Sequence, residues 1–492
     1  LCSGVFVLDG ETLDVPGDGW EPSGVSDKWL CHIHGFDWLR DLKAMGGDQA
    51  RFQGRKMIES WLRRYQTCEP FVWSAALTGQ RLSNWISFYG FFVDTADEAL
   101  KDSYFESLIR QARHLSRALP TAEEGLDILR AIKGLSYAGI CLPQREHWLE
   151  QALDSLQAEG KKQILPDGGH VSRSPQGLRD ALQIYVDIRL ALLTGGYPVP
   201  GELEHTIDRM AQAYRFFRYA DKYQAIFHGS QKGDTVLSDA ILAKSNARGK
   251  ILKELPHSGY QRLVLGRSQM MVDCGTPAPY PYDKGAHASV LAFEFIYGKQ
   301  RVFVSCGSQP HDIQWNDAMR ATAAHNTLCL DHRNSSEILA DQHLGRRPKK
   351  VTVHREDSKE AMLLEVSHDG YVPINGITHR RRFYLGNNGH DLRGEDSLTS
   401  CVGVTKPIEV AVRFHLHPRV LVSLIRDGQE ALIRLPGGAG WRFQYNVGQL
   451  TLENSIYLGE GTRPRKTKQL VITGLMEDDH ALIKWALQRE GL

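Results

Sequence analysis

"GAHASVLAFEFIYGKQRVFVSCGS", residues 285–308, is the stretch that most directly indicates the fold of this chain. Counting from His287, every second residue falls on one face if the segment is extended, because side chains alternate across a strand. That face carries Ser289, Leu291, Phe293, Phe295 and Tyr297. We therefore predict a strand that begins at His287, with a histidine and a serine at one end of an otherwise apolar face.

The chain has 492 residues, too many for one hydrophobic core, so at least two domains are expected. Its composition, 42% hydrophobic and 24% charged, is that of an ordinary globular protein. The net charge of +1 gives no global attraction for nucleic acid, which we do not expect as a partner. No apolar run of 18 residues occurs, so we expect no transmembrane segment.

The first residues lack the basic and apolar regions of a signal peptide, although the chain begins at Leu1. Eight scattered cysteines without a CxxC pair mildly favour reduced thiols. Both observations are compatible with the cytoplasm, and neither decides the compartment.

Helical periodicity extends from about residue 35 to 220, after a lead segment at 1–30. An apolar stripe at steps of three and four follows residues 104–119, and a second helix is expected from Pro143 to Gly160. Many helices of similar length with short turns suggest an antiparallel helical array or ring over 31–222.

Alternation with period two replaces this pattern in residues 223–492, with turn sequences at 386–389, 426–429 and 436–440. Helices first and strands afterwards predict separate all-α and all-β domains rather than a βαβ fold.

Two histidines mark a candidate metal site. His287 and His325 each lie at the edge of a strand-like run, and Ser305 and Cys306 follow the first of them. Two imidazoles with an oxygen or sulfur ligand suit a divalent metal. The alternative is that both histidines are buried and hydrogen-bonded to backbone carbonyls.

Two further segments present candidate catalytic groups. The loop at 165–182 offers His170 and Arg173, which are either functional side chains or parts of a capping loop. The segment "SHDGY" offers His368 and Tyr371, residue types that transfer protons in catalysis. The same segment also reads as a tight turn with Tyr371 packed over it.

Three of these segments carry a resemblance to the heparinase II/III family of polysaccharide lyases. They are "DGGHVSRSP", "AHASVLAFEFIYGKQRVFVSCGS" and "RATAAHNTLCLD", in the order the family has them. The resemblance implies a multidomain α+β protein, with an N-terminal incomplete (α/α) toroid, a C-terminal antiparallel β-sandwich and a sugar-binding cleft. It also implies β-elimination on a uronic-acid-containing polysaccharide, and a location in the cell envelope or periplasm.

The family's functional positions are unevenly kept. His287 and His325 fall on its metal-binding histidines, whereas Ser305 falls on its aspartate ligand. Glycines stand where the family has catalytic residues: Gly285 replaces a histidine, Gly177 a tyrosine, and Gly125 with Leu126 an Asn-His pair. Either this branch uses other side chains, or it binds a glycan without cutting it.

For an active enzyme, our candidate catalytic residues are His170, Arg173, His368 and Tyr371. Cys306 could complete a structural zinc site with His287 and His325, because a thiolate is a better zinc ligand than a serine hydroxyl. No organic cofactor is expected. We expect an acidic polysaccharide or oligosaccharide to contact Asn84, Trp85, Tyr89 and Arg382.

We therefore interpret the chain first as a lyase-like protein that cleaves an acidic glycan. The alternatives are a non-catalytic glycan-binding or envelope protein on a lyase scaffold, and a glycoside hydrolase using carboxylates such as Asp167 and Glu395.

Overall fold

The computed structural model describes residues 5–8, 11–14, 20–21, 24–119, 123–309, 313–461 and 463–491. Two compact units make up the chain. The first comprises Leu1–Ile164 and Asp180–Ile207, and the second comprises Leu165–Arg179 and Asp208–Leu492. The helices α8 (Pro175–Thr194) and α9 (Gly201–Phe216) each contribute residues to both units.

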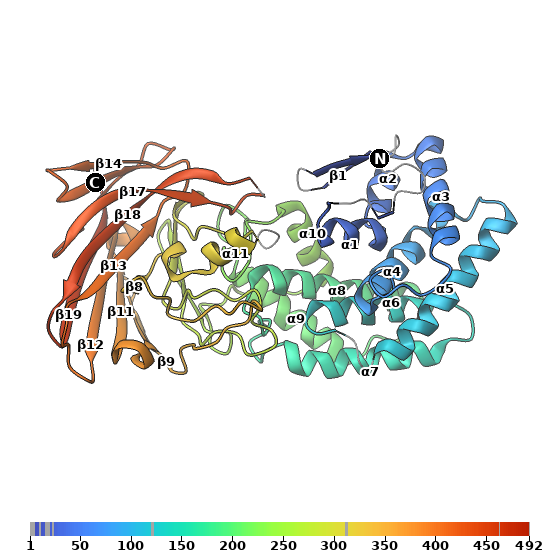
Figure 1. Cartoon of the computed structure of the whole chain (residues 1–492), viewed down its shortest axis with the longest axis horizontal. Coiled ribbons are helices and arrows are strands. Elements are labelled where there is room, and N and C mark those ends of the chain that lie inside the picture. The colour runs from blue at the N-terminus through green and yellow to red at the C-terminus, as the bar shows by residue number, and fades with distance from the viewer. Residues whose placement is uncertain are drawn as a thin grey trace. The chain divides into compact units, whose positions relative to one another are not determined.

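The first unit is helical apart from a hairpin of β1 (Val5–Leu8) and β2 (Glu11–Asp14) (Figure 1). Its helices are α1 (Asp27–Gly35), α2 (Leu39–Met45), α3 (Gly47–Arg64), α4 (Ala75–Phe92), α5 (Glu98–Ala118), α6 (Leu126–Cys141) and α7 (Glu146–Gln163). In α5 most of the predicted stripe is confirmed, since Tyr104, Leu108, Ala112 and Leu115 are buried, whereas Phe105 is 39% exposed.

The helix α7 differs from its prediction at both ends. It begins at Glu146 rather than Pro143, and it continues through Gly160 to Gln163. Gly160 has a packing role instead of a terminating one, because a Cβ there would lie 3.0 Å from the Tyr185 hydroxyl.

Two glycines let α4 and α6 approach closely. A Cβ at Gly134 would overlap the backbone of Gly79, and a Cβ at Gly79 would overlap the backbone of Arg130 and Ala131. The helices therefore meet backbone to backbone.

The second unit contains three antiparallel sheets and the helix α10 (Thr235–Ser245). The five-stranded sheet has the order β3 (Glu254–Leu255), β4 (Tyr260–Leu265), β5 (Ser268–Asp273), β6 (Phe293–Tyr297) and β7 (Gln300–Phe303). The four-stranded sheet has the order β17 (Gln449–Tyr457), β18 (Arg465–Met476), β13 (Ile408–His415) and β8 (Leu328–Leu330).

The largest sheet has eight strands, drawn in orange and red in Figure 1. Its order is β14 (Leu421–Ile425), β15 (Glu430–Arg434), β16 (Gly440–Tyr445), β19 (His480–Arg489), β12 (Asp391–Ser400), β11 (Ile377–Gly386), β10 (Met362–Tyr371) and β9 (Val351–Asp357). Short helices lie between strands: α11 (Ile313–Arg320), η2 (Thr322–Ala324), α12 (Val372–Asn375) and η3 (Asn387–Gly389). The turns predicted at 426–429 and 436–440 join β14 to β15 and β15 to β16, as expected.

An aromatic cluster forms the centre of this unit. Phe293 stacks on Trp485 with ring centroids 5.5 Å apart, and Phe414 packs edge-on against the same indole. Helices first and antiparallel sheets afterwards confirm the predicted fold class. The domain boundaries expected at residues 30 and 222 stay predictions.

The strand predicted to begin at His287 was wrong in its first part, because β6 begins only at Phe293. Leu291 has φ +64°, which is incompatible with an extended strand. The Leu291 N–H donates to the Asp273 carbonyl and the Ala292 N–H donates to that of Ser289, so the backbone turns here. His287 and Ser289 therefore lie on a buried loop and not on a sheet face.

Candidate functional site

The loop that carries Arg173 is tied to the five-stranded sheet through that guanidinium. Arg173 is buried, and its Nη2 forms an ion pair with Asp273. Its Nε donates to the Ser258 carbonyl at 2.7 Å, and its Nη2 also donates to the Gly259 carbonyl at 3.1 Å. Burial by itself would lower the pKa of Arg173, but Asp273 outweighs it and the pKa is raised. This arginine is thus fully engaged inside the unit.

Asp273 is the centre of the surrounding hydrogen bonds. His228 Nε2 lies 3.0 Å from its carboxylate, and the Ser289 hydroxyl donates to it at 2.8 Å. Burial would raise the pKa of Asp273, but Arg173 and then His228 hold it below its ordinary value. The carboxylate is therefore charged at neutral pH; Arg173 supplies the counter-charge, and His228 and Ser289 supply hydrogen bonds.

His287 and His325 lie next to this centre with their ring nitrogens 3.1 Å apart, Nδ1 to Nε2. The Gly229 N–H can only donate, and it does so to His287 Nε2 at 2.9 Å. A neutral His287 therefore has its proton on Nδ1 and donates it to His325 Nε2.

His325 in turn has its proton on Nδ1, which faces the Ser305 hydroxyl at 3.3 Å. Burial lowers the pKa of His325 to about 3 and that of His287 well below its ordinary value, so both rings are neutral. We call this chain, from Gly229 through His287 and His325 to Ser305, the histidine relay.

The donor atoms of the relay do not complete a metal site. The Ser305 hydroxyl faces the nitrogen of His325 that points away from His287, so these three residues do not converge on one point. The Cys306 Sγ lies 3.4 Å from His415 Nδ1, and burial raises the pKa of this thiol to about 12. Within the described ranges, no cluster of three or more His, Cys, Asp or Glu is arranged to bind a metal ion.

His170 is buried near Arg173 but bonds locally. Its Nδ1 lies 2.7 Å from the Ser172 hydroxyl, and burial lowers its pKa to about 4. A neutral, buried imidazole with this low pKa is a poor proton acceptor at neutral pH.

His368 and Tyr371 make other buried hydrogen bonds, away from Asp273. The Gly370 N–H donates to His368 Nδ1, so His368 Nε2 donates to His379 Nδ1 at 3.3 Å. His379 Nε2 then donates to Asp396 at 2.7 Å. The Tyr371 hydroxyl donates to the Leu328 carbonyl at 3.0 Å, and burial raises the pKa of this phenol well above its ordinary value.

Arg381 and Trp485 also donate hydrogen bonds to Asp396. The guanidinium donates to both carboxylate oxygens, at 2.7 and 3.0 Å, and Trp485 Nε1 donates at 3.1 Å. Arg173, His368 and Tyr371 thus each bond backbone groups of the second unit, and Arg173 also pairs with a buried carboxylate, whereas His170 bonds a neighbouring serine.

The three candidates for sugar contact on α4 make contacts within the first unit, and one of them, Trp85, is fully buried. Trp85, expected to be a platform, is fully buried and stacks on Tyr104 at 4.8 Å, so its ring is not available to a ligand. Asn84 donates to the Gly35 carbonyl and to Asp37, each at 2.8 Å. Tyr89 is half-buried against Phe105.

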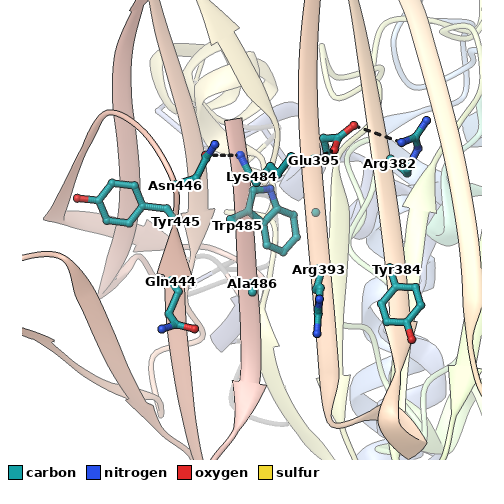
Figure 2. A pocket seen from close by; sticks show the side chains of 11 residues that line it. Arg382, Tyr384, Arg393, Glu395, Gln444, Tyr445, Asn446, Lys484, Trp485 and Ala486 are labelled. Atoms are coloured by element: carbon teal, nitrogen blue, oxygen red, sulfur yellow. Dashed lines mark hydrogen bonds and ion pairs between the residues drawn. The ribbon is translucent and has the colours of Figure 1, made fainter. Parts of the chain in front are cut away.

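Arg382 lies elsewhere, on the outer face of the eight-stranded sheet, and lines a hollow of about 350 Å³ (Figure 2). Glu395, one of the carboxylates considered for hydrolysis, pairs with it at 3.4 Å. The other, Asp167, accepts from the N–H and the hydroxyl of Ser258. The two carboxylates are therefore held in different surroundings.

Sequence reasoning missed Asp273, His228 and the hollow. Asp273 ends the apolar strand "SQMMVD", and a charged residue at the end of a buried strand is the signal that could have found it. Within the described residues, no helix is long and apolar enough to span a membrane.

Comparison with known proteins places these observations in a family. The model described as "Heparinase II/III N-terminus" matches residues 56–247, and that described as "Heparinase II/III-like, C-terminal" matches residues 247–486. The "FtsZ-localized protein C" of Caulobacter vibrioides is 31% identical over 512 residues, covering 99% of this chain and 87% of that protein.

Solved structures share the fold. The crystal structure of heparinase III matches with a TM-score of 0.80 and 14% identity, over 97% of this chain and 80% of that one. A heparan sulfate lyase HepC mutant from Pedobacter heparinus matches with a TM-score of 0.71 and 16% identity, over 99% and 81%. At these identities the likeness concerns the fold alone.

Proposed function

The chain belongs to the heparinase II/III-like family, and on that premise we propose that it is a non-catalytic member that acts by binding, in association with the FtsZ assembly at the site of cell division. The scaffold is that of a polysaccharide lyase. In this chain we infer that the scaffold provides binding surfaces and does not cleave a glycosidic bond.

The observation that carries the proposal is the histidine relay together with the Asp273 centre. β-Elimination needs a base beside the acidic carbon and a cation or amide beside the carboxylate, both reachable by substrate. Here Arg173 forms a buried ion pair with Asp273, and both nitrogens of each relay histidine are hydrogen-bonded to protein groups. Freeing any of them would leave a buried polar partner unsatisfied, which costs about 1–3 kcal/mol per group.

The glycine at position 285 supports the same proposal. Gly285 is exposed, and a side chain there would meet open space, so nothing in the packing requires a glycine in place of the family's histidine. Loss of a catalytic side chain at a position that could hold one is expected where catalysis is not under selection.

The association with FtsZ is suggested by the name of the Caulobacter relative, which describes localisation and not catalysis. We accordingly propose the division site as the location. The envelope location and the acidic glycan implied by the resemblance remain the competing proposals, to be tested with it.

Two measurements test the proposal together. Purified protein is incubated with a panel of acidic polysaccharides while the ultraviolet absorbance of unsaturated uronate is followed, and it is separately sedimented with and without FtsZ polymers. We expect a flat absorbance trace and co-sedimentation that depends on FtsZ. A sustained rise in absorbance would show lyase activity and contradict the non-catalytic role. If the protein does not sediment with FtsZ polymers under any condition, the proposed FtsZ association is wrong.

A further inference from the structure

The eight-stranded sheet ends in β14, a strand of five residues with the sequence Leu-Val-Ser-Leu-Ile (Figure 1). Along the part of the chain that the structure describes, β14 pairs on one side only, with β15, so its other side is an open edge. Alternate residues of an edge strand direct their N–H and C=O groups away from the sheet, where another strand can pair with them. β14 is therefore a template for strand addition.

The opposite edge of the same sheet is protected against such pairing, whereas β14 is not. The edge strand β9 carries His354, Arg355, Glu356 and Asp357 among its seven residues. Charged side chains on an edge strand are a common defence against pairing with other chains. β14 contains no charged residue and no proline, and Leu421 in it is 69% exposed. This difference between the two edges indicates that the β14 edge is a contact surface.

The core-facing side chains of β14 are incompletely covered. Val422 and Leu424 pack against the hydrophobic core of the second unit, but both are only partly buried. Burial of the apolar surface that remains open on them would stabilise an added strand by about 25 cal/mol per Å². A strand added at β14 would thus extend the core as well as the sheet.

β14 is complementary to itself in antiparallel pairing. Its outer face carries Leu421, Ser423 and Ile425, and its core face carries Val422 and Leu424. A register centred on Ser423 pairs Leu421 with the partner subunit's Ile425 and keeps core-facing residues opposite each other. A slip by one residue would place outer-face residues opposite core-facing ones, and a larger slip would leave part of the strand unpaired. The pattern of the strand therefore selects one register.

Charges at the two ends of β14 match in the same arrangement. Arg419 precedes the strand and Asp427 follows it, and both are exposed. Antiparallel pairing brings the beginning of one strand to the end of its copy, so Arg419 and the partner subunit's Asp427 come to the same end of the pair. The two-fold symmetry repeats this match at the other end. Exposed pairs of this kind contribute more to the orientation of the two copies than to their affinity.

We propose that two copies of this chain associate through β14, antiparallel about a two-fold axis at Ser423, and so join their eight-stranded sheets. Both copies use the same strand, so the interface is closed and the assembly stops at a dimer. The paired strands are much smaller than a standard interface of about 20–30 residues per side, so we expect a weak dimer, with a dissociation constant of about 1–100 µM. This inference goes beyond the proposed function, and it holds whether or not the chain associates with FtsZ.

Sedimentation velocity of the full chain, without FtsZ, tests the proposal between about 1 and 200 µM, the range in which such a weak dimer forms. We expect a sedimentation coefficient that rises with concentration from that of a monomer to that of a dimer. Ser423→Lys places two like charges directly opposite each other at the axis, so the dissociation constant should rise at least about tenfold. Ser423 is exposed, and circular dichroism and thermal unfolding check that the variant folds.

A second variant gives the test its specificity. Ser423→Glu alone should weaken the dimer for the same reason, but an equimolar mixture of the two Ser423 variants should dimerise again, because opposite charges then meet at the axis. Thr352→Lys is the matched control, since Thr352 is exposed on β9 at the opposite edge of the sheet, and it should leave the dimer unchanged.

Three outcomes would overturn the proposal. The protein stays monomeric over the whole concentration range, Ser423→Lys dimerises as the wild type does, or the mixture of the two Ser423 variants stays monomeric. Each of these results is independent of lyase activity and of FtsZ.

Discussion

His287 Nδ1 and His325 Nε2 lie 3.1 Å apart, and the outer nitrogen of each ring is engaged by a protein group, Gly229 N–H on one side and the Ser305 hydroxyl on the other. The relay is therefore a closed set of hydrogen bonds. The nitrogens of both rings are hydrogen-bonded without a metal ion, so the protein should not depend on one for stability.

We expect the purified protein to be insensitive to metal removal. Dialysis against EDTA should change the melting temperature of the second unit by less than about 2 °C, because the relay hydrogen bonds do not depend on an ion. Elemental analysis of the protein before dialysis should give zinc well below one atom per chain. About one zinc per chain, together with a large fall in melting temperature after EDTA, would contradict this and restore the expected site at His287, His325 and Cys306.

Asp273 gives a second prediction, about stability. Asp273→Asn keeps the size of the side chain but leaves the buried guanidinium of Arg173 without its counter-charge. Removing one partner of a buried pair costs about 3–5 kcal/mol, so we expect a loss of this size in the free energy of unfolding of the second unit. Chemical denaturation followed by a probe of the β-domain measures it.

The matched control is Asp239→Asn. Asp239 pairs with Arg218 at 2.8 Å, but its side chain is 47% exposed. Such exposed pairs contribute at most about 1 kcal/mol, so this variant should unfold nearly as the wild type does. Equal effects of the two substitutions would show that the charge of Asp273 does not compensate the buried guanidinium of Arg173.

The fold was predictable because its two signals are local. The apolar stripe of α5 and the turn at 426–429 each depend on residues within one element, and most of the stripe and the turn are found as expected. The segment 287–292 was not predictable from its alternation, because the turn at Leu291 is imposed by the distant Asp273 backbone.

The site was predictable only in part for the same reason. Sequence reasoning grouped His287 with His325, and the structure brings them together. Arg173, however, reaches partners 55 and 100 residues away, His228 and Asp273, which no motif marks. The burial of Trp85 follows from the aromatic rings that surround it, which "NWISFYG" alone does not indicate.

A pair of glycines on α4 gives a third prediction. Gly79→Ala would force a methyl group into the backbone of α6, so we expect the free energy of unfolding of the first unit to fall by about 2 kcal/mol or more. Gly90→Ala lies on the same helix, where a Cβ would meet open space, and should instead stabilise by about 0.5–1 kcal/mol. Thermal unfolding of both variants, which differ only in position, decides whether the contact of α4 with α6 sets the difference. Equal shifts of the same sign would contradict the close approach.

Buried histidines predict how stability depends on pH. Burial lowers the pKa of His170 and of His415 to about 4, whereas an unfolded histidine titrates near 6.5. Between these values the unfolded chain binds more protons than the folded chain, so stability falls as the pH falls through 6.5 towards 4. Each such histidine lowers the free energy of unfolding by about 2 kcal/mol at pH 5 relative to neutral pH.

Asp273 and Asp396 act at lower pH and in the same direction. Their folded pKa values are depressed, so the stability they contribute is present above the unfolded value near 3.9 and is lost as the pH falls below it. We therefore expect two stages of acid destabilisation, the first between about pH 6.5 and 4 from the histidines and the second below about pH 4 from the carboxylates.

Denaturation at pH 7, 6 and 5 of the wild type and of His415→Gln separates the first stage. Without an imidazole at position 415, the loss of stability between pH 7 and 5 should shrink by about 2 kcal/mol, even though the variant is less stable at pH 7. A slope that His415→Gln does not alter would mean that this imidazole is already protonated in the folded protein, against its burial beside the Ser455 hydroxyl and the Ala323 carbonyl.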